Sequence, residues 1–243
     1  MKILGIIPAR YSSTRFPGKP LADILGKTMI QRVYERAKLA KNLCDVVVAT
    51  DDARIYECVE SFGGKAVMTD SDLPNGTSRC WQAVCLLGGD VDAVINIQGD
   101  EPLLDPVMID EAAELLEECY CVTLCREFRD GEDVNNPNAV KVVMSQEGYA
   151  LYFSRSVIPY KRNASTLPVY QHIGIYGYST DFLKKYVSLS NTPLSDAESL
   201  EQLRILEEGC RIRVKVTSSK CESVGVDTPE DLQRVREILN AEV

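Results

Sequence analysis

Short apolar runs alternate with amphipathic helical segments over the first half of the chain, and this alternation restricts the fold more than any other feature. Four of the apolar runs are typical of buried strands: residues 2–8, 45–50, 65–69 and 93–97. The segments between them place apolar side chains at helical spacing, as Ile55, Val59 and Phe62 do. The pattern predicts right-handed βαβ units and a parallel sheet with helices on its faces.

In a parallel sheet of this kind, ligands bind beyond the carboxyl ends of the strands. The loops that follow the four runs are therefore expected to meet at one edge of the sheet. Helices are expected over residues 28–41 and 79–87. A further helix should begin at Asp105 and Pro106, a favourable N-cap and first position, and run to about Cys119.

The second half of the chain has a mixed pattern. Residues 140–144 and 149–154 flank a four-residue turn and predict a hairpin, and residues 172–178 predict a further strand. A helix is expected from Thr192 to Gly209, and Thr228 should cap the last helix. We therefore expect a sheet-based first half with an inserted mixed region at about residues 122–190.

Composition excludes several classes of protein. The net charge of −9 at pH 7 disfavours a general nucleic-acid binder, which usually has a basic surface. No apolar stretch approaches the length of a membrane span, and the run at residues 3–7 is shorter than the apolar core of a signal peptide. These features, with 45% hydrophobic residues, predict a globular protein of the cytoplasm.

Nine scattered cysteines suit a reducing compartment better than a disulfide framework. Cys119, Cys121 and Cys125 lie close enough in sequence to raise the question of a zinc site. They lack a matching second pair, and the chain contains a single histidine. Buried structural thiols are therefore the favoured interpretation.

Residues 9–21, ARYSSTRFPGKPL, gather Arg10, Arg15 and Lys19 in an otherwise acidic chain. The segment leaves the first strand at the binding edge, but it is no P-loop, because Pro20 stands where Ser or Thr would follow Lys19. Guanidinium forks, an ammonium and hydroxyl groups around a Pro-Gly turn suit a flexible triphosphate. The residue types alone equally allow a solvated cationic loop.

Two aspartates complete a candidate site. Asp100, in INIQGDEP, follows a buried strand at the same edge, and Asp227, in VGVDTPED, precedes a helix. Either carboxylate could cap a turn or a helix N-terminus, or could hold a hard cation such as Mg²⁺. Beside a triphosphate-binding loop, the pair would supply ligands for the metal that bridges the phosphates.

These motifs resemble those of the CMP-Kdo synthetases, the 3-deoxy-manno-octulosonate (Kdo) cytidylyltransferases of lipopolysaccharide synthesis. The resemblance covers nearly the whole chain. The matching stretches are IIPARYSSTRFPGKPL, VATDD, NGTSR, NIQGDEP, NPNAVKVV, GYALYFSR, HIGIYGY, LEQLR and GVDTPEDL. It implies an α/β, nucleotide-diphospho-sugar transferase-like (Rossmann-like) fold, with a mixed, mainly parallel sheet in a single domain over residues 1–243. It also implies a homodimer.

The resemblance assigns roles to matching positions. For CTP binding it implies Pro8, Ala9, Arg10, Arg15, Lys19, Gly76, Thr77 and Asp100. Asp100 and Asp227 would bind Mg²⁺ and, with Lys19 and Arg15, would act in catalysis. For the sugar acid it implies Arg79, Gln98, Arg155, His172, Tyr176, Glu201 and Gln202. Arg155 is the first choice for the substrate carboxylate, because a guanidinium binds carboxylates in bidentate fashion.

Plain structural roles compete with several of these assignments. Glu201 and Gln202 lie among core leucines of a helix and could be ordinary exposed residues. A hydrogen-bonded structural histidine in a strand is more common than a catalytic one, so no base role is given to His172. Tyr176 could simply pack.

Three positions depart from the family pattern: Ser78, Ser179 and Ser195 replace charged residues. Because these losses fall near the sugar side, the preferred acid could be Kdo, its 8-amino analogue or another ulosonic acid. Ser195 should also weaken the capping box of its helix. An alternative function of a different class is that of a non-catalytic nucleotide-binding protein with the same fold.

Overall fold

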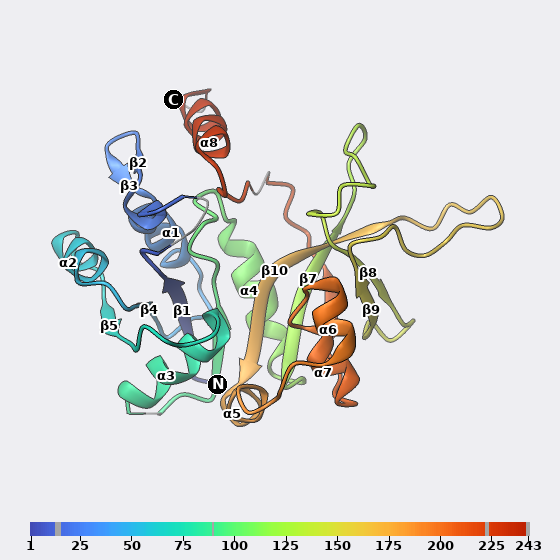
Figure 1. The fold of residues 1–243 in the computed structure, drawn as a ribbon, viewed down its shortest axis with the longest axis horizontal. Coiled ribbons are helices and arrows are strands. Elements are labelled where there is room, and N and C mark those ends of the chain that lie inside the picture. The colour runs from blue at the N-terminus through green and yellow to red at the C-terminus, as the bar shows by residue number, and fades with distance from the viewer. Residues whose placement is uncertain (13–15, 89, 222–223, 242–243) are drawn as a thin grey trace.

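The computed structural model describes residues 1–12, 16–88, 90–221 and 224–241. Within these residues, a nine-stranded mixed sheet runs in the order β11-β7-β10-β6-β1-β4-β5, with β8 and β9 attached beside β10 (Figure 1). The strands are β1 (Ile3–Ala9), β4 (Asp45–Thr50), β5 (Ala66–Met68), β6 (Ala93–Asn96), β7 (Cys121–Glu127), β8 (Lys141–Met144), β9 (Ala150–Ser154), β10 (Tyr170–Ser179) and β11 (Arg213–Val216). A separate small hairpin consists of β2 (Asp23–Ile24) and β3 (Lys27–Thr28).

The four strands expected from the first half of the sequence form the parallel part of the sheet. β1 pairs in parallel with β4 on one side and with β6 on the other, and β4 pairs in parallel with β5. In β1, Ile6 and Ile7 point to opposite faces and are both fully buried. Burial on both faces explains why the sequence of this strand is a continuous apolar run.

The second half of the chain makes the sheet mixed. β10 lies antiparallel between β6 and β7, and β11 pairs in parallel with β7. The hairpin of β8 and β9 was expected, and β8 pairs with the start of β10. The expected fold class, a mixed and mainly parallel α/β sheet, is confirmed, while the division at residues 122–190 stays a prediction.

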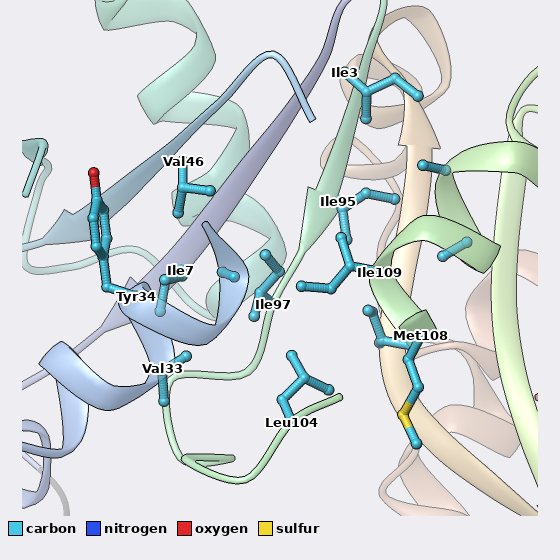
Figure 2. Close-up of a cluster of buried hydrophobic side chains, with 14 of the residues drawn as sticks. Ile3, Ile7, Val33, Tyr34, Val46, Ile95, Ile97, Leu104, Met108 and Ile109 are labelled. Atoms are coloured by element: carbon cyan, nitrogen blue, oxygen red, sulfur yellow. The ribbon is translucent and has the colours of Figure 1, made fainter. Parts of the chain in front are cut away.

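The helices are η1 (Lys19–Leu21), α1 (Met29–Ala37), α2 (Ala53–Ser61), α3 (Gly76–Leu86), α4 (Pro106–Leu115), α5 (Thr180–Tyr186), α6 (Pro193–Glu198), α7 (Leu203–Glu207) and α8 (Pro229–Ala241). α1, α2 and α4 share one buried apolar cluster with the sheet, and α3, α5 and α7 share another. Figure 2 shows the first cluster, in which Val33 of α1 and Ile109 of α4 lie beside Ile7 and Ile95 of the sheet. None of the helices in the described ranges is long and apolar enough to span a bilayer.

Several helix boundaries differ from those expected. α1 ends at Ala37 rather than at residue 41, and α3 begins at Gly76 rather than at Arg79. α4 ends at Leu115 rather than near Cys119, because its last turn tightens into hydrogen bonds of three-residue spacing, as between Leu116 N–H and Ala113 O. The helix expected from Thr192 to Gly209 is two helices. Ser199, with φ +50° and ψ +50°, adopts the left-handed conformation and breaks it.

The expectation that Ser195 weakens the capping box was wrong. The Ser195 hydroxyl accepts a hydrogen bond from the Thr192 backbone N–H at 3.0 Å, which is the reciprocal bond of such a box. The carboxylate of Glu207 accepts further bonds from the N–H groups of Leu194 and Ser195, both at 3.2 Å. Serine is short enough to make this bond while remaining buried at the start of α6.

Candidate active site

The ammonium of Lys19 joins the two predicted carboxylates. Its Nζ donates to Asp100 Oδ2 at 2.8 Å and to Asp227 Oδ1 at 3.3 Å. It also donates to the carbonyl of Val226 at 2.7 Å, and the Val226 N–H donates to the carbonyl of Asp100 at 2.9 Å. Two aspartates that are far apart in the sequence therefore lie side by side.

Local structure fixes each member of this group. Gly18, with φ +72°, adopts the left-handed conformation at the start of η1 and directs Lys19 inward. Asp227 precedes α8, where the carboxylate of Asp231 accepts bonds from the N–H groups of Asp227 (3.0 Å) and Thr228 (2.9 Å). These caps satisfy N–H groups that the helix itself leaves without partners.

Exposure distinguishes the members of the group. The side chain of Lys19 is 15% exposed, whereas those of Asp100 and Asp227 are 33% and 47% exposed. The cation therefore lies beneath two carboxylates that a ligand can still reach. In the described part of the chain, no three His, Cys, Asp or Glu side chains gather as a complete metal site.

The loop that carries Asp100 runs against the end of β1. A Cβ atom added to Gly99 would lie 2.9 Å from the carbonyl oxygen of Pro8, closer than such contacts occur. A glycine is needed here because the two backbones approach so closely. This approach places Asp100 beside the first residues of the basic loop.

A cavity of 630 Å³ continues from Pro8 across the sheet. Most of the residues predicted for the site line it. They are Pro8, Gly76, Thr77, Gln98, Arg155, His172, Tyr176, Glu201 and Gln202. The cavity lies between the N-terminus of α3, strand β10 and the junction of α6 with α7.

Besides the group formed by Lys19, Asp100 and Asp227, three described residues among those predicted do not line this cavity. Ala9 is buried in β1, and the Arg10 guanidinium donates to the carbonyl of Leu73. Arg79 is fully buried and pairs with Asp51 at 3.0 Å, so its placement favours an internal ion pair over sugar binding. Burial lowers the pKa of its guanidinium, and Asp51 opposes that effect. Arg15 lies outside the described residues.

Arg155 holds main-chain carbonyls as well as facing the cavity. Its guanidinium donates to Glu198 O at 2.6 Å, to Pro137 O at 3.0 Å and to Ser199 O at 3.2 Å. These bonds use three of the five N–H groups of the fork, so some donor capacity remains for a ligand. Arg155 therefore fixes the α6–α7 junction at the cavity wall.

Sequence reasoning missed several residues of the cavity wall. They are Asn96, Val140, Gly174, Tyr178, Tyr186, Ser199 and Leu200. Asn96 could have been found, because it is a polar residue inside the apolar run AVINI. Asn96 Oδ1 and Tyr176 OH are buried without a hydrogen-bond partner in the described structure, so the sheet under the cavity holds unsatisfied polar groups.

His172 is held in an apolar aromatic setting. Its ring contacts Phe153 edge-on at a centroid distance of 5.1 Å and Tyr176 at 5.3 Å. Burial lowers the pKa of the imidazole to about 3, so the ring is neutral at neutral pH. A neutral imidazole carries one donor and one acceptor nitrogen toward its surroundings.

Residues 4–215 match the family model described as cytidylyltransferase. The chain belongs to this family. The relatives include 8-amino-3,8-dideoxy-manno-octulosonate cytidylyltransferase of Shewanella halifaxensis, 51% identical, with 96% of each chain covered. They also include 3-deoxy-manno-octulosonate cytidylyltransferase of Geobacter sulfurreducens, 49% identical, with 98% of this chain and 100% of the relative covered.

A solved structure of CMP:2-keto-3-deoxy-manno-octonic acid synthetase complexed with CTP is also similar to this cytidylyltransferase. The two chains are 42% identical, each is covered completely, and the TM-score is 0.94. The nucleotidyltransferase fold implied by the sequence motifs therefore extends over the whole chain.

The three serines that depart from the family pattern lie in different settings. The Ser179 hydroxyl caps α5 by accepting from the Phe182 N–H at 3.2 Å, and Ser195 completes the capping box described above. Ser78 lies in the first turn of α3, where its N–H donates to the Asn75 side chain at 2.8 Å. Two of the departures therefore have local structural roles in this cytidylyltransferase.

Replacing Gly99 with alanine should impair catalysis. The added methyl group would press on the Pro8 carbonyl, displace the loop and move Asp100, and we expect kcat/KM to fall by at least about tenfold. Gly225→Ala is the matched control, because a Cβ there meets nothing within 4 Å. Steady-state kinetics that showed equal activity for the two variants would contradict the role given to this contact.

The single histidine provides a direct test of the environment described for His172. Because its pKa is lowered to about 3, the NMR signals of its ring should not titrate between about pH 5 and 8. By linkage, this group opposes folding as the pH falls from about 6.5 toward 3, since only the unfolded chain takes up its proton readily. A midpoint near 6.5 in the folded protein would show that the ring is solvated instead.

Proposed function

We propose that this cytidylyltransferase transfers CMP from CTP to Kdo, or to its 8-amino analogue, with release of pyrophosphate. The observation that carries the proposal is the Lys19–Asp100–Asp227 group, whose Asp100 loop packs against Pro8 of a polar cavity of 630 Å³. The relatives at about 50% identity support either acid, because both names occur among them. Kdo is the first choice, and the 8-amino analogue is the alternative.

The reaction is a single displacement. The anomeric 2-hydroxyl of the acid attacks the α-phosphorus of CTP, the bond from phosphorus to the bridging oxygen breaks, and pyrophosphate leaves. The hydroxyl proton passes to solvent or to a base that we do not assign. Phosphoryl-type transfers of this kind require positioning and charge stabilisation rather than a covalent enzyme intermediate.

The cavity can position the acid through its own residues. Arg155 retains N–H groups for the carboxylate, and Gln98 is fixed by donation of its Nε2 to the Gly174 carbonyl at 2.8 Å. Glu201 and Gln202 face the cavity from the α6–α7 junction and suit the hydroxyl groups of the sugar. Gly76 and Thr77, at the N-terminus of α3, suit the cytidine side.

The donor set at Asp100 and Asp227 fits Mg²⁺. Two adjacent, partly exposed carboxylates are hard oxygen ligands, and Mg²⁺ usually takes one or two carboxylates together with phosphate oxygens and water. When bound, the metal would lower the pKa of the attacking hydroxyl and offset charge on the phosphates. Asp100 and Asp227 would hold it.

Lys19, Arg10 and Arg15 are proposed to bind the triphosphate. All three N–H groups of the Lys19 ammonium already have partners, so its contact with phosphate requires exchange of at least one of them. Binding of a cation between the carboxylates would favour that exchange, because the carboxylates then have another positive partner. We further propose that the enzyme works as a homodimer in the cytoplasm.

A pyrophosphate-release panel tests the function. CTP should react with Kdo or with 8-amino-Kdo, and ATP, GTP and UTP should be poor substrates. Direct competition between the two acids then identifies the preferred one. Absence of release from CTP with both acids would contradict the proposal, and a preference for a sialic-type nonulosonate would replace the acid while leaving the reaction type.

Asp100→Asn should lower turnover by about 100-fold or more, as expected for loss of one group that stabilises the transition state. The amide keeps the size of the side chain but removes the charge that would hold the metal. Asp90→Asn, whose side chain is 89% exposed, is the control and should leave turnover unchanged. Near-normal turnover of Asp100→Asn at all Mg²⁺ concentrations would refute the metal assignment.

A further inference from the structure

Thr123 occupies an unusual position on β7, behind the cavity wall. It is fully buried and pairs in register with Tyr176 of β10. The register between the two strands shifts between Ile173 and Tyr176. At this irregularity the Thr123 Oγ1 lies 2.7 Å from Ile175 O and 3.2 Å from Ile173 O, so its hydroxyl can donate to a carbonyl where the ladder is interrupted.

The same oxygen lies 3.0 Å from Nε2 of His172. A hydroxyl has a single proton, and the two carbonyl oxygens can only accept. Ile175 O, at 2.7 Å, is the nearest of the three partners, so we assign the Thr123 proton to this carbonyl, and an oxygen lone pair then faces His172. A hydrogen bond then forms only if Nε2 carries the proton and donates to Thr123. Because the imidazole is neutral, its Nδ1 is left as an acceptor.

We propose that Thr123 is a positioning residue that fixes His172 as the Nε2–H tautomer, so that Nδ1 accepts a hydrogen bond from a hydroxyl or ammonium group of the sugar acid. The assignment of the ligand rests on the proposed function, whereas the tautomer rests on the Thr123 contacts alone. His172 lines the cavity, and within the described structure no residue pairs with its Nδ1. The Phe153 and Tyr176 rings pack against the imidazole and restrict its rotation.

This arrangement gives the cavity a specific preference. A fixed acceptor favours a ligand that presents an N–H or O–H donor, and it disfavours an analogue that lacks one, because a buried acceptor would then stay unpaired. Hydroxyl and ammonium groups are both donors, so the arrangement serves Kdo and its 8-amino analogue alike. A deoxy analogue that lacks the contacted group should bind more weakly.

The tautomer can be measured directly, because the chain contains one histidine. Long-range ¹H–¹⁵N correlation spectra of the substrate-free wild-type protein should show a protonated Nε2 and an unprotonated Nδ1. A protonated Nδ1 would overturn the proposal even in a fully active enzyme. Since no substrate is present, the result does not depend on which acid the enzyme uses.

Two substitutions extend the test. Thr123→Val removes the hydroxyl and should allow the Nδ1–H tautomer, raise KM for the sugar acid roughly tenfold and leave KM for CTP unchanged. Thr123→Ser keeps the hydroxyl and should retain both the wild-type tautomer and KM. A Thr123→Val enzyme with wild-type tautomer and KM would overturn the proposal, and so would a Thr123→Ser enzyme that behaves like Thr123→Val.

The outcomes separate this proposal from the proposed function. If the pyrophosphate panel identifies another acid, the wild-type tautomer and the effect of Thr123→Val on that acid still test Thr123. If Thr123→Val does not fold, the wild-type spectrum and Thr123→Ser decide the question. Thermal unfolding of each variant distinguishes a loss of positioning from a general loss of stability.

Discussion

The ammonium of Lys19 holds together three segments that are remote in sequence: the basic loop after β1, the loop after β6 and the chain before α8. Each of its three donors has a partner, two of them carboxylates. Without this cation, the charges of Asp100 and Asp227 would repel each other across a short distance. The contact therefore makes it possible for one polypeptide to present two adjacent negative groups to a ligand.

The cavity beside this group is assembled from both halves of the sheet. The parallel half contributes Pro8 and Gln98 from the ends of β1 and β6, and the antiparallel strand β10 contributes His172 and Tyr176. Because β10 pairs directly with β6, the proposed nucleotide side and the proposed acid side rest on adjacent strands. A sheet strand moves less than a loop, so the reacting groups can be held in a fixed relative position.

The parallel half could be predicted from the sequence because strong periodicity and caps specify it locally. β7 was missed because its residues, CVTLCRE, mix apolar side chains with thiol, hydroxyl and charged groups, and the first five become buried only in the context of β10 and β11. The place of Asp100 at the sheet edge followed from strand order, and the family resemblance implied that Asp227 lies beside it. Neither indicated that the side chain of Arg79 points inward. Its partner Asp51 lies in a different loop, and the identity of the two residues does not indicate that they form an ion pair.

The break at Ser199 places Glu201 and Gln202 in a turn, where their carbonyls accept the first hydrogen bonds of α7 from the N–H groups of Arg204 and Ile205. Glu201 and Gln202 lie in a short junction between α6 and α7, while Leu203 and Ile205 of α7 anchor the core behind them. Substitution of the side chain of Glu201 or Gln202 removes none of these main-chain hydrogen bonds. Leu203 and Ile205 remain buried. Under the proposed function, the side chains of this wall can therefore change toward a different sugar acid while the main-chain contacts that maintain the fold stay in place.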